Sequence, residues 1–282
     1  MPISSAATLS IAPLQSLGFI GAGRMATALA RGCVEAGLVP PGGVLASDPF
    51  EPAREKFSQD VPGSRVAGDN AAVLAGAGTV FLAVKPQLMS AVLADIRPRV
   101  EPRHVLVSIA AGVTLARLAA ALPSGTRLVR VMPNTPCLIG LGASCFSRGA
   151  TATDADAALV ERLLASVGRA YQVDEAQLDA VTGLSGSGPA FVYTAIEALA
   201  AGGVAKGLPP ALALELAAQT ALGAAAMVQQ TNLSPAALRE QVASPGGTTL
   251  AGLDALERAG GSAAFRAAVE AAARRSAELG HA

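Results

Sequence analysis

Two loops of small residues in the second half of the chain carry groups that could bind an anion. One reads Gly-Leu-Ser-Gly-Ser-Gly-Pro-Ala over residues 183–190, and the other reads Ser-Pro-Gly-Gly-Thr-Thr over residues 244–249. Each loop precedes a helical period, so its backbone N–H groups and hydroxyls would meet at a helix N-terminus, where a carboxylate is stabilised. Ordinary N-capping by Ser187, and by Ser244 or Thr248, is the simpler alternative for either loop alone.

A glycine-rich turn near the start of the chain adds a second kind of chemistry. Residues 18–26 read Gly-Phe-Ile-Gly-Ala-Gly-Arg-Met-Ala and contain the end of an apolar run. Gly21 would allow a tight strand-to-helix turn, and Gly23 would let the backbone approach a pyrophosphate, with Ala26 at the third position of the dinucleotide-binding fingerprint. A turn that binds nothing is the alternative. The fingerprint and the two loops together favour a nucleotide cofactor and a small carboxylate substrate.

Polar or small residues follow three further apolar runs. Ser47 and Asp48 end the second run, where an acidic residue usually binds the adenosine ribose, whereas Arg54 nearby would suit the phosphate of NADP. Lys85 follows the run at 79–84, and Ser-Ile-Ala-Ala-Gly follows the next one at 108–112. Such strand ends border the ligand crevice of an open α/β sheet. A turn role for Asp48, a solvent-facing Lys85 and a tight turn at 108–112 stay open as alternatives.

The chain lacks an obvious strong acid or base for oxidising or forming an alcohol. Its histidines are His104 and His281 and its lysines are Lys56, Lys85 and Lys206, and none of them lies in a recognisable catalytic pattern. Handling a hydroxyl proton usually requires a His, Lys or Tyr side chain. Reduction of a C=N bond needs only a hydrogen-bond donor, and it therefore fits this sequence better.

The elements that must position these residues change in kind along the chain. Short apolar runs at 17–20, 44–47, 79–84, 105–109 and 128–132 alternate with helical periods, which predicts βαβ units and a doubly wound parallel sheet. From about residue 179 onward only helices are expected, at 192–202, 209–229, 235–242, 250–259 and 262–279. The predicted organisation is a flexible tail over residues 1–15, a Rossmann-like dinucleotide-binding domain over 16–177 and an all-helical domain over 178–282.

Composition excludes several classes of protein. The formal net charge is +0 and no basic cluster is present, so neither nucleic acid nor a membrane surface is expected as a partner. The uncharged stretch at 216–238 is too polar at its C-terminal end for a membrane span and is expected to be a buried helix followed by a polar turn. Three cysteines without Cys/His clustering argue against disulfides and against a metal site. The tail lacks Lys and Arg, so no targeting peptide is expected, and the predicted location is the cytoplasm.

At this point the motifs, taken together and in order, resemble those of the pyrroline-5-carboxylate reductase family over residues 17–279. The residues that carry the resemblance are the turn at 19–25, Ala-Val-Lys-Pro at 83–86, Met-Pro-Asn-Thr-Pro at 132–136, Leu-Ser-Gly-Ser-Gly-Pro-Ala at 184–190 and, most specifically, Ser-Pro-Gly-Gly-Thr-Thr at 244–249. The resemblance implies hydride transfer from NAD(P)H to the C=N bond of 1-pyrroline-5-carboxylate, giving L-proline. It also implies a homodimer with interlocked C-terminal helices, which in many members assembles further into a decamer.

The resemblance also implies roles for individual residues. Thr249 matches the threonine whose hydroxyl faces the ring nitrogen, while Ser244, Gly247 and Thr248 would hold the carboxylate, with Glu175 as an acidic residue near the substrate. The implied cofactor-binding residues are, for the diphosphate, Ile20, Gly21, Ala22, Gly23, Arg24 and Met25; for the adenosine, Ser47, Asp48 and Asn70; and for the nicotinamide, Ala83, Val84, Lys85, Pro86, Ser108, Ala110 and Ala111.

Coenzyme preference and two rival functions remain as expectations to test. Arg24 stands where many family members carry Asn or Gln, and Asp48 favours NADH; the family as a whole often favours NADPH, so NADPH is expected with some use of NADH. A β-hydroxyacid dehydrogenase is one rival, with Lys206 as the only lysine in the helical half. A nucleotide-binding protein without enzymatic activity is the other, although neither Thr249 nor the 245–247 loop is lost.

Overall fold

The structure is a computed structural model that describes residues 14–281. Of the predicted flexible tail, residues 1–15, the part over 1–13 therefore lies outside the described residues. Leu14 already belongs to the folded part, because its N–H donates to the carbonyl of Leu38 at 2.8 Å and its side chain packs against the core. The chain divides into two compact units. The first comprises the residues up to Gly186 together with those from Ala273 onward, and the second comprises Ser187–Ala272.

An eight-stranded sheet forms the centre of the first unit. Its order is β3-β2-β1-β4-β5-β6-β7-β8, and every neighbouring pair is parallel except β6 and β7. The strands are β1 Leu17–Ile20, β2 Val44–Ser47, β3 Arg65–Ala67, β4 Thr79–Leu82, β5 Val105–Ser108, β6 Arg127–Met132, β7 Gly142–Arg148 and β8 Gly168–Gln172. The first six positions follow the order of dinucleotide-binding sheets, in which the crevice lies between β1 and β4.

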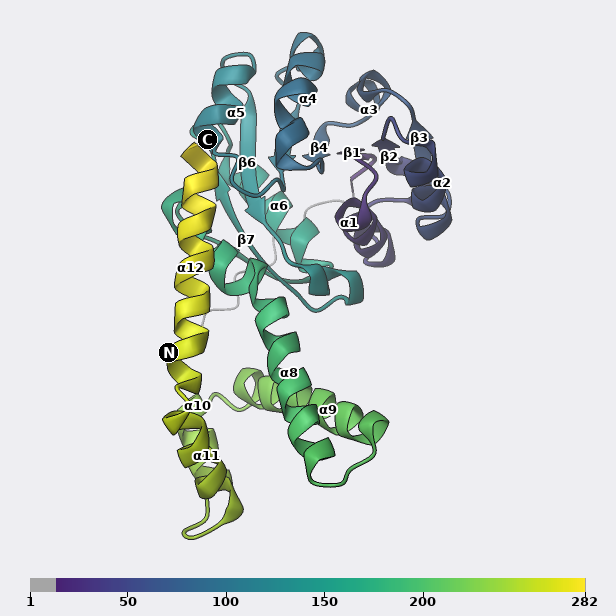
Figure 1. Cartoon of the computed structure of the whole chain (residues 1–282). Helices are drawn as coiled ribbons and strands as arrows, with labels where there is room; N and C mark the ends of the chain where they lie inside the picture. Colours follow the sequence, from purple (N-terminus) through teal and green to yellow (C-terminus); the bar gives the residue numbers. More distant parts are fainter. Residues whose placement is uncertain (1–13, 282) are drawn as a thin grey trace. The chain divides into compact units, whose positions relative to one another are not determined.

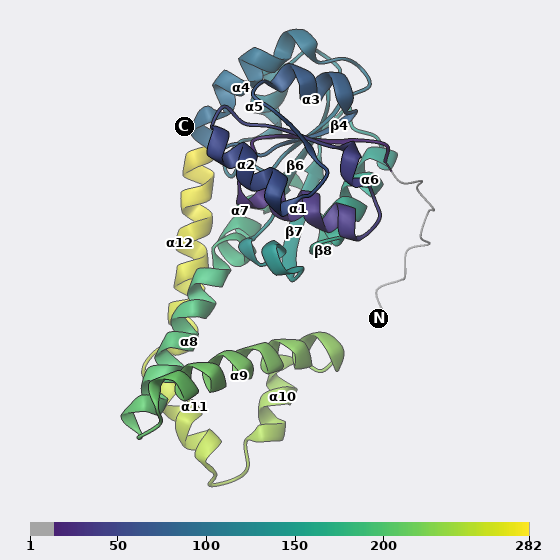
Figure 2. The same ribbon diagram turned by 90° about the vertical axis from the view of Figure 1, so that its right-hand side faces the viewer.

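Helices cover both faces of this sheet (Figures 1 and 2). They are α1 Arg24–Glu35, α2 Glu51–Asp60, α3 Asn70–Gly76, α4 Met89–Ile96, α5 Leu115–Ala121 and α6 Asp154–Ala165. One core packs α1, α2 and α6 against the sheet, and a second core packs α3, α4 and α5 against it. Strands β1, β2, β4 and β5 are buried along their whole length, which explains why they read as continuous apolar runs.

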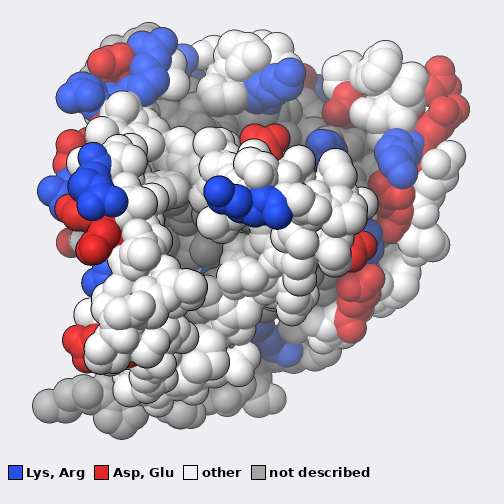
Figure 3. Space-filling model, turned by 60° about the horizontal axis from the view of Figure 1, so that its bottom comes forward, with Lys and Arg blue, Asp and Glu red and all other residues white. Residues whose placement is uncertain are grey.

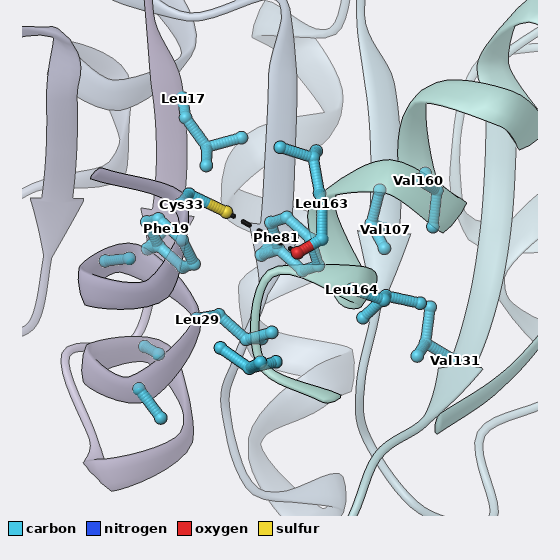
Figure 4. Packing of buried hydrophobic residues seen from close by; sticks show 14 of the residues in the cluster. Leu17, Phe19, Leu29, Cys33, Phe81, Val107, Val131, Val160, Leu163 and Leu164 are labelled. Atoms are coloured by element: carbon cyan, nitrogen blue, oxygen red, sulfur yellow. Dashed lines mark hydrogen bonds between the residues drawn. The ribbon is translucent and has the colours of Figure 1, made fainter. Parts of the chain in front are cut away.

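The first core is built around aromatic rings and branched aliphatic side chains (Figure 4). The rings of Phe19 and Phe81, on neighbouring strands, stack with centroids 5.2 Å apart. Cys33 on α1 belongs to the same core, and its thiol donates to the carbonyl of Leu163 on α6 at 3.7 Å. Helices α1 and α6 are thus neighbours that share this apolar core.

The prediction of a doubly wound sheet followed by helices is confirmed, but the sequence patterns did not reveal β3, α3, β7, α6 and β8. Strand β7 runs antiparallel to β6, and only alternate residues over its first half are buried. The outermost β8 is largely exposed, so neither strand forms the continuous apolar run that marked the central ones.

A buried arginine ties the end of the first unit together. Arg130 on β6 is 5% exposed, and its guanidinium lies 3.0 Å from the Glu175 carboxylate and 3.8 Å from that of Asp179 on α7 (Leu178–Val181). The Asp179 carboxylate also accepts the hydroxyl hydrogen of Ser276 at 2.7 Å. These contacts hold α7 and the last turns of the chain against the sheet, so the compact unit extends beyond residue 177. The boundary predicted between residues 177 and 178 stays a prediction.

The second unit consists of helices alone, as the sequence predicted. They are α8 Gly188–Ala205, α9 Pro210–Gln230, α10 Pro235–Val242, α11 Thr248–Arg258 and the first part of α12 Gly261–His281. Helix α8 packs against α9, where Gly203 allows a close approach: a Cβ there would lie 3.1 Å from the side chain of Leu208 and 3.4 Å from that of Ala213. Small residues thus set the helix spacing in this unit.

Most apolar side chains of the second unit are exposed within the single chain. Among its described residues only Ala213 and Ala217 are buried hydrophobics, whereas the leucines 212, 214, 216 and 222 of α9 are all exposed. The helix expected within 216–238 is present as the end of α9, and a polar connection follows it at 231–234. The expected burial of this helix is wrong for the isolated chain, because no element of this unit covers that face. Helices α8 and α9 carry one charged residue each, and Figure 3 presents a face with a broad uncharged area.

Two helical stretches, Glu175–Ala205 and Pro210–Gln230, are long and apolar enough to cross a bilayer, with mean hydropathies of 1.2 and 1.5. Helices of soluble proteins pass the same test of length and composition, so these two stretches are weak evidence for a membrane span.

Candidate functional site

The turn between β1 and α1 has the backbone geometry that its glycines predict. Gly21 has a φ of +99°, and a Cβ there would lie 2.6 Å from the carbonyl oxygen of Ala83, so only glycine fits. Gly23 is the N-cap of α1, with extended backbone angles and no atom within 4 Å of a Cβ position. No side chain caps α1, and the first N–H groups of a helix have no partner inside it. This helix end is open to an anion.

The end of β2 is a network of acceptors and backbone donors. The Asp48 carboxylate accepts from the N–H of Ala22 at 3.0 Å and from the N–H of Phe50 at 2.9 Å. Asp48 therefore links the turn after β2 to the glycine-rich loop. It has the turn role that was the alternative, and it also lies where the acidic residue that binds the adenosine ribose is expected. One nitrogen of the Arg54 guanidinium donates to the carbonyls of Asp48 and Pro49, at 2.8 and 3.1 Å.

A cavity of about 370 Å³ lies beside this turn within the first unit. It brings together seven residues predicted to bind the cofactor, namely Gly23, Arg24, Met25, Ala83, Val84, Lys85 and Ala111. Ser108 and Ala110 are buried beneath the same strand ends, and the hydroxyl of Ser108 accepts from the N–H of Ala110 at 3.4 Å. Pro86 begins a short 3₁₀ turn next to the exposed Lys85. The carboxyl ends of β1, β4 and β5 thus form one concave surface.

Ile109, residues 132–135 and Gly186 complete the lining of this cavity. Gly186 belongs to the candidate loop at 183–190, whereas residues 132–135 were not among the predicted site residues. Asn134 is central to them. It is 8% exposed, its side-chain oxygen accepts from the N–H of Ala143 at 2.9 Å, and its side-chain nitrogen donates to the carbonyl of Ser185 at 3.1 Å. One amide therefore anchors the loop after β6, the start of β7 and the turn that contains Gly186. The Pro-Asn-Thr-Pro sequence directly after a strand was the available signal.

The loop at 183–190 has a different structure from that expected. Residues Thr182–Gly186 form a π-helical turn, a feature frequently found at functional sites. The hydroxyls of Thr182 and Ser185 donate to the carbonyls of Leu178 and Val181, at 2.8 and 3.2 Å. Ser187 makes no capping hydrogen bond at the start of α8, so the capping alternative is wrong there. The contribution of this loop is its backbone, which borders the cavity at Gly186.

Glu175, predicted to lie near the substrate, has structural partners in the first unit. Its carboxylate accepts from the backbone N–H of Leu115 at 2.7 Å and pairs with the guanidinium of Arg130 at 3.0 Å. It also lines a separate cavity, of about 660 Å³, between α5 and the β6–β7 strands. Its assignment as a substrate residue stays a prediction.

The loop between α10 and α11, in the second unit, forms an open helix N-terminus. Gly247 is the N-cap of α11 with extended angles, and no side chain caps the helix, so the capping alternative for Ser244 and Thr248 is wrong as well. Gly246 has a φ of +71°, which favours glycine, and a Cβ on Gly247 would crowd the hydroxyl and the carbonyl oxygen of Ser244. Thr249 lies in the first turn, which holds no acidic residue. This arrangement suits a carboxylate.

Arg24 and Lys85 are the ionisable residues that line the cavity beside the glycine-rich turn, and within the part of the chain that the structure describes no His, Cys, Asp or Glu side chain lines it. The His104 ring is fully buried: its Nδ1 accepts from the N–H of Glu101 at 2.8 Å, so its Nε2 must donate to the Leu74 carbonyl at 2.9 Å, which makes it a neutral structural histidine. Burial raises the pKa of the Cys33 thiol to about 11 and also raises that of Cys137. Among the described residues, no three His, Cys, Asp or Glu side chains are grouped as a metal ion would require.

Two known protein families match separate parts of the chain. Residues 16–112 match a family described as NADP oxidoreductase, coenzyme F420-dependent. Residues 175–279 match a family described as pyrroline-5-carboxylate reductase dimerisation. The first match covers the glycine-rich turn and the strand ends of the cavity, and the second covers both small-residue loops.

Several relatives are similar to this chain over nearly its whole length. Proteins named pyrroline-5-carboxylate reductase from Methanosarcina acetivorans and Glycine max are each 46% identical, covering 94% of this chain and 98% and 96% of their own length. Among solved structures, a pyrroline-5-carboxylate reductase from Coxiella burnetii aligns with a TM-score of 0.88 at 32% identity, and a Plasmodium falciparum pyrroline carboxylate reductase with NADP bound aligns at 0.84 and 31%. Each covers 94% of this chain and 98% of its own.

Proposed function

This chain belongs to the pyrroline-5-carboxylate reductase family, and on that premise we propose which of its residues perform each part of the reaction. The chain is an NAD(P)H-dependent oxidoreductase that reduces the C=N bond of 1-pyrroline-5-carboxylate and forms L-proline. The observation that carries this conclusion is the 46% identity that extends over 94% of the chain, through both the nucleotide-binding and the helical unit. The rival reading as a β-hydroxyacid dehydrogenase has no such support, and its Lys206 is only the C-cap of α8.

The cofactor residues fit a dinucleotide in their charge, space and hydrogen-bond donors. The uncapped N-terminus of α1 would hold the diphosphate, since Gly23 leaves open space where a side chain would stand. Ser47, Asp48 and Asn70 would contact the adenosine, and residues 83–86 and 108–111 would lie against the nicotinamide. When bound, the nicotinamide supplies the hydride.

Substrate binding would depend on the first turn of α11. Its uncapped N–H groups, together with the hydroxyls of Ser244 and Thr248, would hold the carboxylate of the substrate. The Thr249 hydroxyl would donate a hydrogen bond to the ring nitrogen and orient the imine carbon. A threonine hydroxyl is too weak an acid to release its proton unaided, so its role is to position the nitrogen and to stabilise it electrostatically.

We propose NADPH as the preferred coenzyme, with some use of NADH. The P. falciparum relative with NADP bound supports the first part. The exposed Arg24 beside the open helix end would add positive charge near the phosphates. Asp48 at the end of β2 supports some use of NADH, because a carboxylate there suits the free ribose hydroxyl of NADH.

We propose that the chain works as a homodimer through its helical unit, and that dimers assemble into a decamer. The match to a dimerisation family supports this, as do the exposed leucines of α9, which would leave water on contact with a second copy. With its apolar faces covered in this way, the protein would be a cytoplasmic enzyme without membrane or nucleic-acid partners.

Replacing Thr249 by alanine tests the catalytic proposal. The loss of an oxyanion-type donor costs roughly 3–4 kcal/mol, so the turnover number of Thr249→Ala should fall by roughly two to three orders of magnitude. The decrease is measured as NADPH consumption at 340 nm with 1-pyrroline-5-carboxylate. The dissociation constant of NADPH, measured by calorimetry, should stay close to that of the wild type.

Thr249→Ser is the matched control because it keeps the hydroxyl and removes only a methyl group. It should retain most of the turnover. If Thr249→Ala turned over substrate as fast as the wild type, Thr249 would have no part in the mechanism. If the wild type itself bound NADPH but did not reduce the substrate, the assignment of the reaction would be wrong.

A further inference from the structure

A chain of hydrogen bonds leads from the adenosine end of the proposed cofactor site to the surface. Ser47, buried at the end of β2, lies with its Oγ 2.7 Å from Oδ1 of Asn70, the first residue of α3. Nδ2 of Asn70 lies 2.9 Å from Oδ2 of Asp95 on α4. Asp95 also pairs with Arg99 one turn later, at 3.5 Å, and both of these side chains are about half exposed. Three elements distant in sequence thus share one polar chain.

The charge of Asp95 fixes the direction of every hydrogen bond in this chain. An ionised carboxylate only accepts, so the Asn70 amide must turn its NH₂ group toward Asp95. The amide oxygen then faces Ser47, and the Ser47 hydroxyl must donate its single hydrogen to it. Ser47 is left with acceptor lone pairs, and Asn70 has one of its two N–H donors engaged.

This orientation distinguishes the two coenzymes. The ribose 2′-hydroxyl of NADH can donate to an acceptor such as Ser47 or Asp48, whereas the 2′-phosphate of NADPH is acceptor-only and needs donors. We propose that Asp95 is a positioning residue that sets coenzyme preference: by orienting Asn70 and Ser47, it withdraws donors from a 2′-phosphate and keeps NADH usable. This inference rests on the proposed function only in placing the adenosine ribose at the end of β2.

Asp95→Asn tests the proposal with almost no change in side-chain size. The new amide can donate as well as accept, so Asn70 can turn its NH₂ toward Ser47 and free the serine hydroxyl to donate to a phosphate. One donor regained toward a charged group corresponds to roughly tenfold in affinity. Calorimetry should therefore show 2′,5′-ADP binding about tenfold tighter to the variant, while the affinity for 5′-AMP changes less than about twofold.

The same variant is then assayed with both coenzymes. The ratio of kcat/KM for NADPH to kcat/KM for NADH should rise by a similar factor of about ten. Thermal unfolding serves as the structural readout, and it should stay near the wild-type value because Asp95 is half exposed. A change in stability alone would alter both nucleotides equally and would leave this ratio unmoved.

Arg99→Gln is the matched control, since it breaks the same Asp95–Arg99 ion pair but keeps the carboxylate that orients Asn70. Its NADPH/NADH ratio should stay unchanged or fall. In the background of Asn70→Ala, the effect of Asp95→Asn should disappear, because the amide that transmits it is gone. A rise in the Arg99→Gln ratio equal to that of Asp95→Asn would overturn the proposal.

The fragment measurements separate this inference from the proposed reaction. If the wild type binds both fragments but does not reduce 1-pyrroline-5-carboxylate, the proposed reaction is wrong. The ratio of the affinities for 2′,5′-ADP and 5′-AMP still decides the role of Asp95 in that case. An unchanged or lowered preference for 2′,5′-ADP in Asp95→Asn overturns that role. Binding of neither fragment by the wild type overturns both the cofactor site and the inference.

Discussion

Gly23 offers a substitution that separates cofactor binding from folding. Its backbone angles, φ −78° and ψ 177°, are open to any residue, and nothing lies within 4 Å of the position that a Cβ would take. A methyl group there should fit the folded chain without strain. It would, however, stand in the open space at the N-terminus of α1, where the pyrophosphate of the cofactor is proposed to approach the backbone.

The expected magnitudes follow from this geometry. Alanine is a poorer N-cap than glycine, but it also restricts the unfolded chain, and the two effects of up to about 1 kcal/mol oppose each other. The free energy of unfolding of Gly23→Ala should therefore stay within about 1 kcal/mol of the wild type. The pyrophosphate would be displaced from the helix amides, and one lost hydrogen bond to a charged group, about 1.5–3 kcal/mol, weakens NADPH binding roughly 10- to 150-fold.

Gly21→Ala provides the contrast two residues away. With a φ of +99° and a Cβ at 2.6 and 2.8 Å from the carbonyl atoms of Ala83, alanine would strain the backbone and displace it from β4. About 1–3 kcal/mol of stability should be lost from the strain alone. Calorimetric titration with NADPH and thermal unfolding measure the two quantities for both variants. Wild-type affinity in Gly23→Ala would refute the placement of the pyrophosphate at this helix end.

Two further predictions concern assembly and pH. Light scattering at micromolar concentration should give at least twice the chain mass of 27.9 kDa, because the apolar faces of α8 and α9 are uncovered in one chain, and a stable monomer would contradict the proposed dimer. The Cys33 thiol has a pKa of about 11 when folded and 9.0 as the ordinary value, so its contribution to stability is complete below pH 9 and is lost as the pH rises through 11. The wild type should lose roughly 2–3 kcal/mol more than Cys33→Ala over that range in denaturant titrations, and parallel pH profiles would show that Cys33 ionises normally.

The strands that the sequence revealed share one physical property. Strands β1, β2, β4 and β5 are buried on both faces, so their residues are almost all apolar, and the strands could be recognised without any partner. Strands β7 and β8 lie at one edge of the sheet, where exposed positions interrupt the apolar pattern. The assignment of β7 depended on its pairing with β6, and that of β8 on its pairing with β7, which are contacts across the sheet.

The same distinction applies to the candidate site, where some residues could be recognised from the local sequence and others only from their contacts in the folded chain. Gly21 and Gly23 were identifiable because a tight turn and a close backbone approach can be met only by glycine at that spacing. Asp95 was not, because its role consists of a hydrogen bond to Asn70, distant in sequence, and nothing local distinguishes it from a surface residue. Asn134 stood out only as part of the Pro-Asn-Thr-Pro motif, and its hydrogen bonds to Ser185 and Ala143 became visible only in the structure. The capping alternatives for the two small-residue loops were likewise decided only by the absence of side-chain caps at α8 and α11.

By itself, therefore, the sequence determined the features that depend on backbone conformation and on burial along one segment: the central strands, the helical second unit, the glycine turns and the motifs that identify the family. Tertiary structure alone decided which polar side chains meet, as in the pairing of Arg130 with Glu175 and the orientation of Asn70 by Asp95. The physical reason is that local conformation follows from neighbouring residues, whereas the direction of a side-chain hydrogen bond depends on groups that only folding brings within reach.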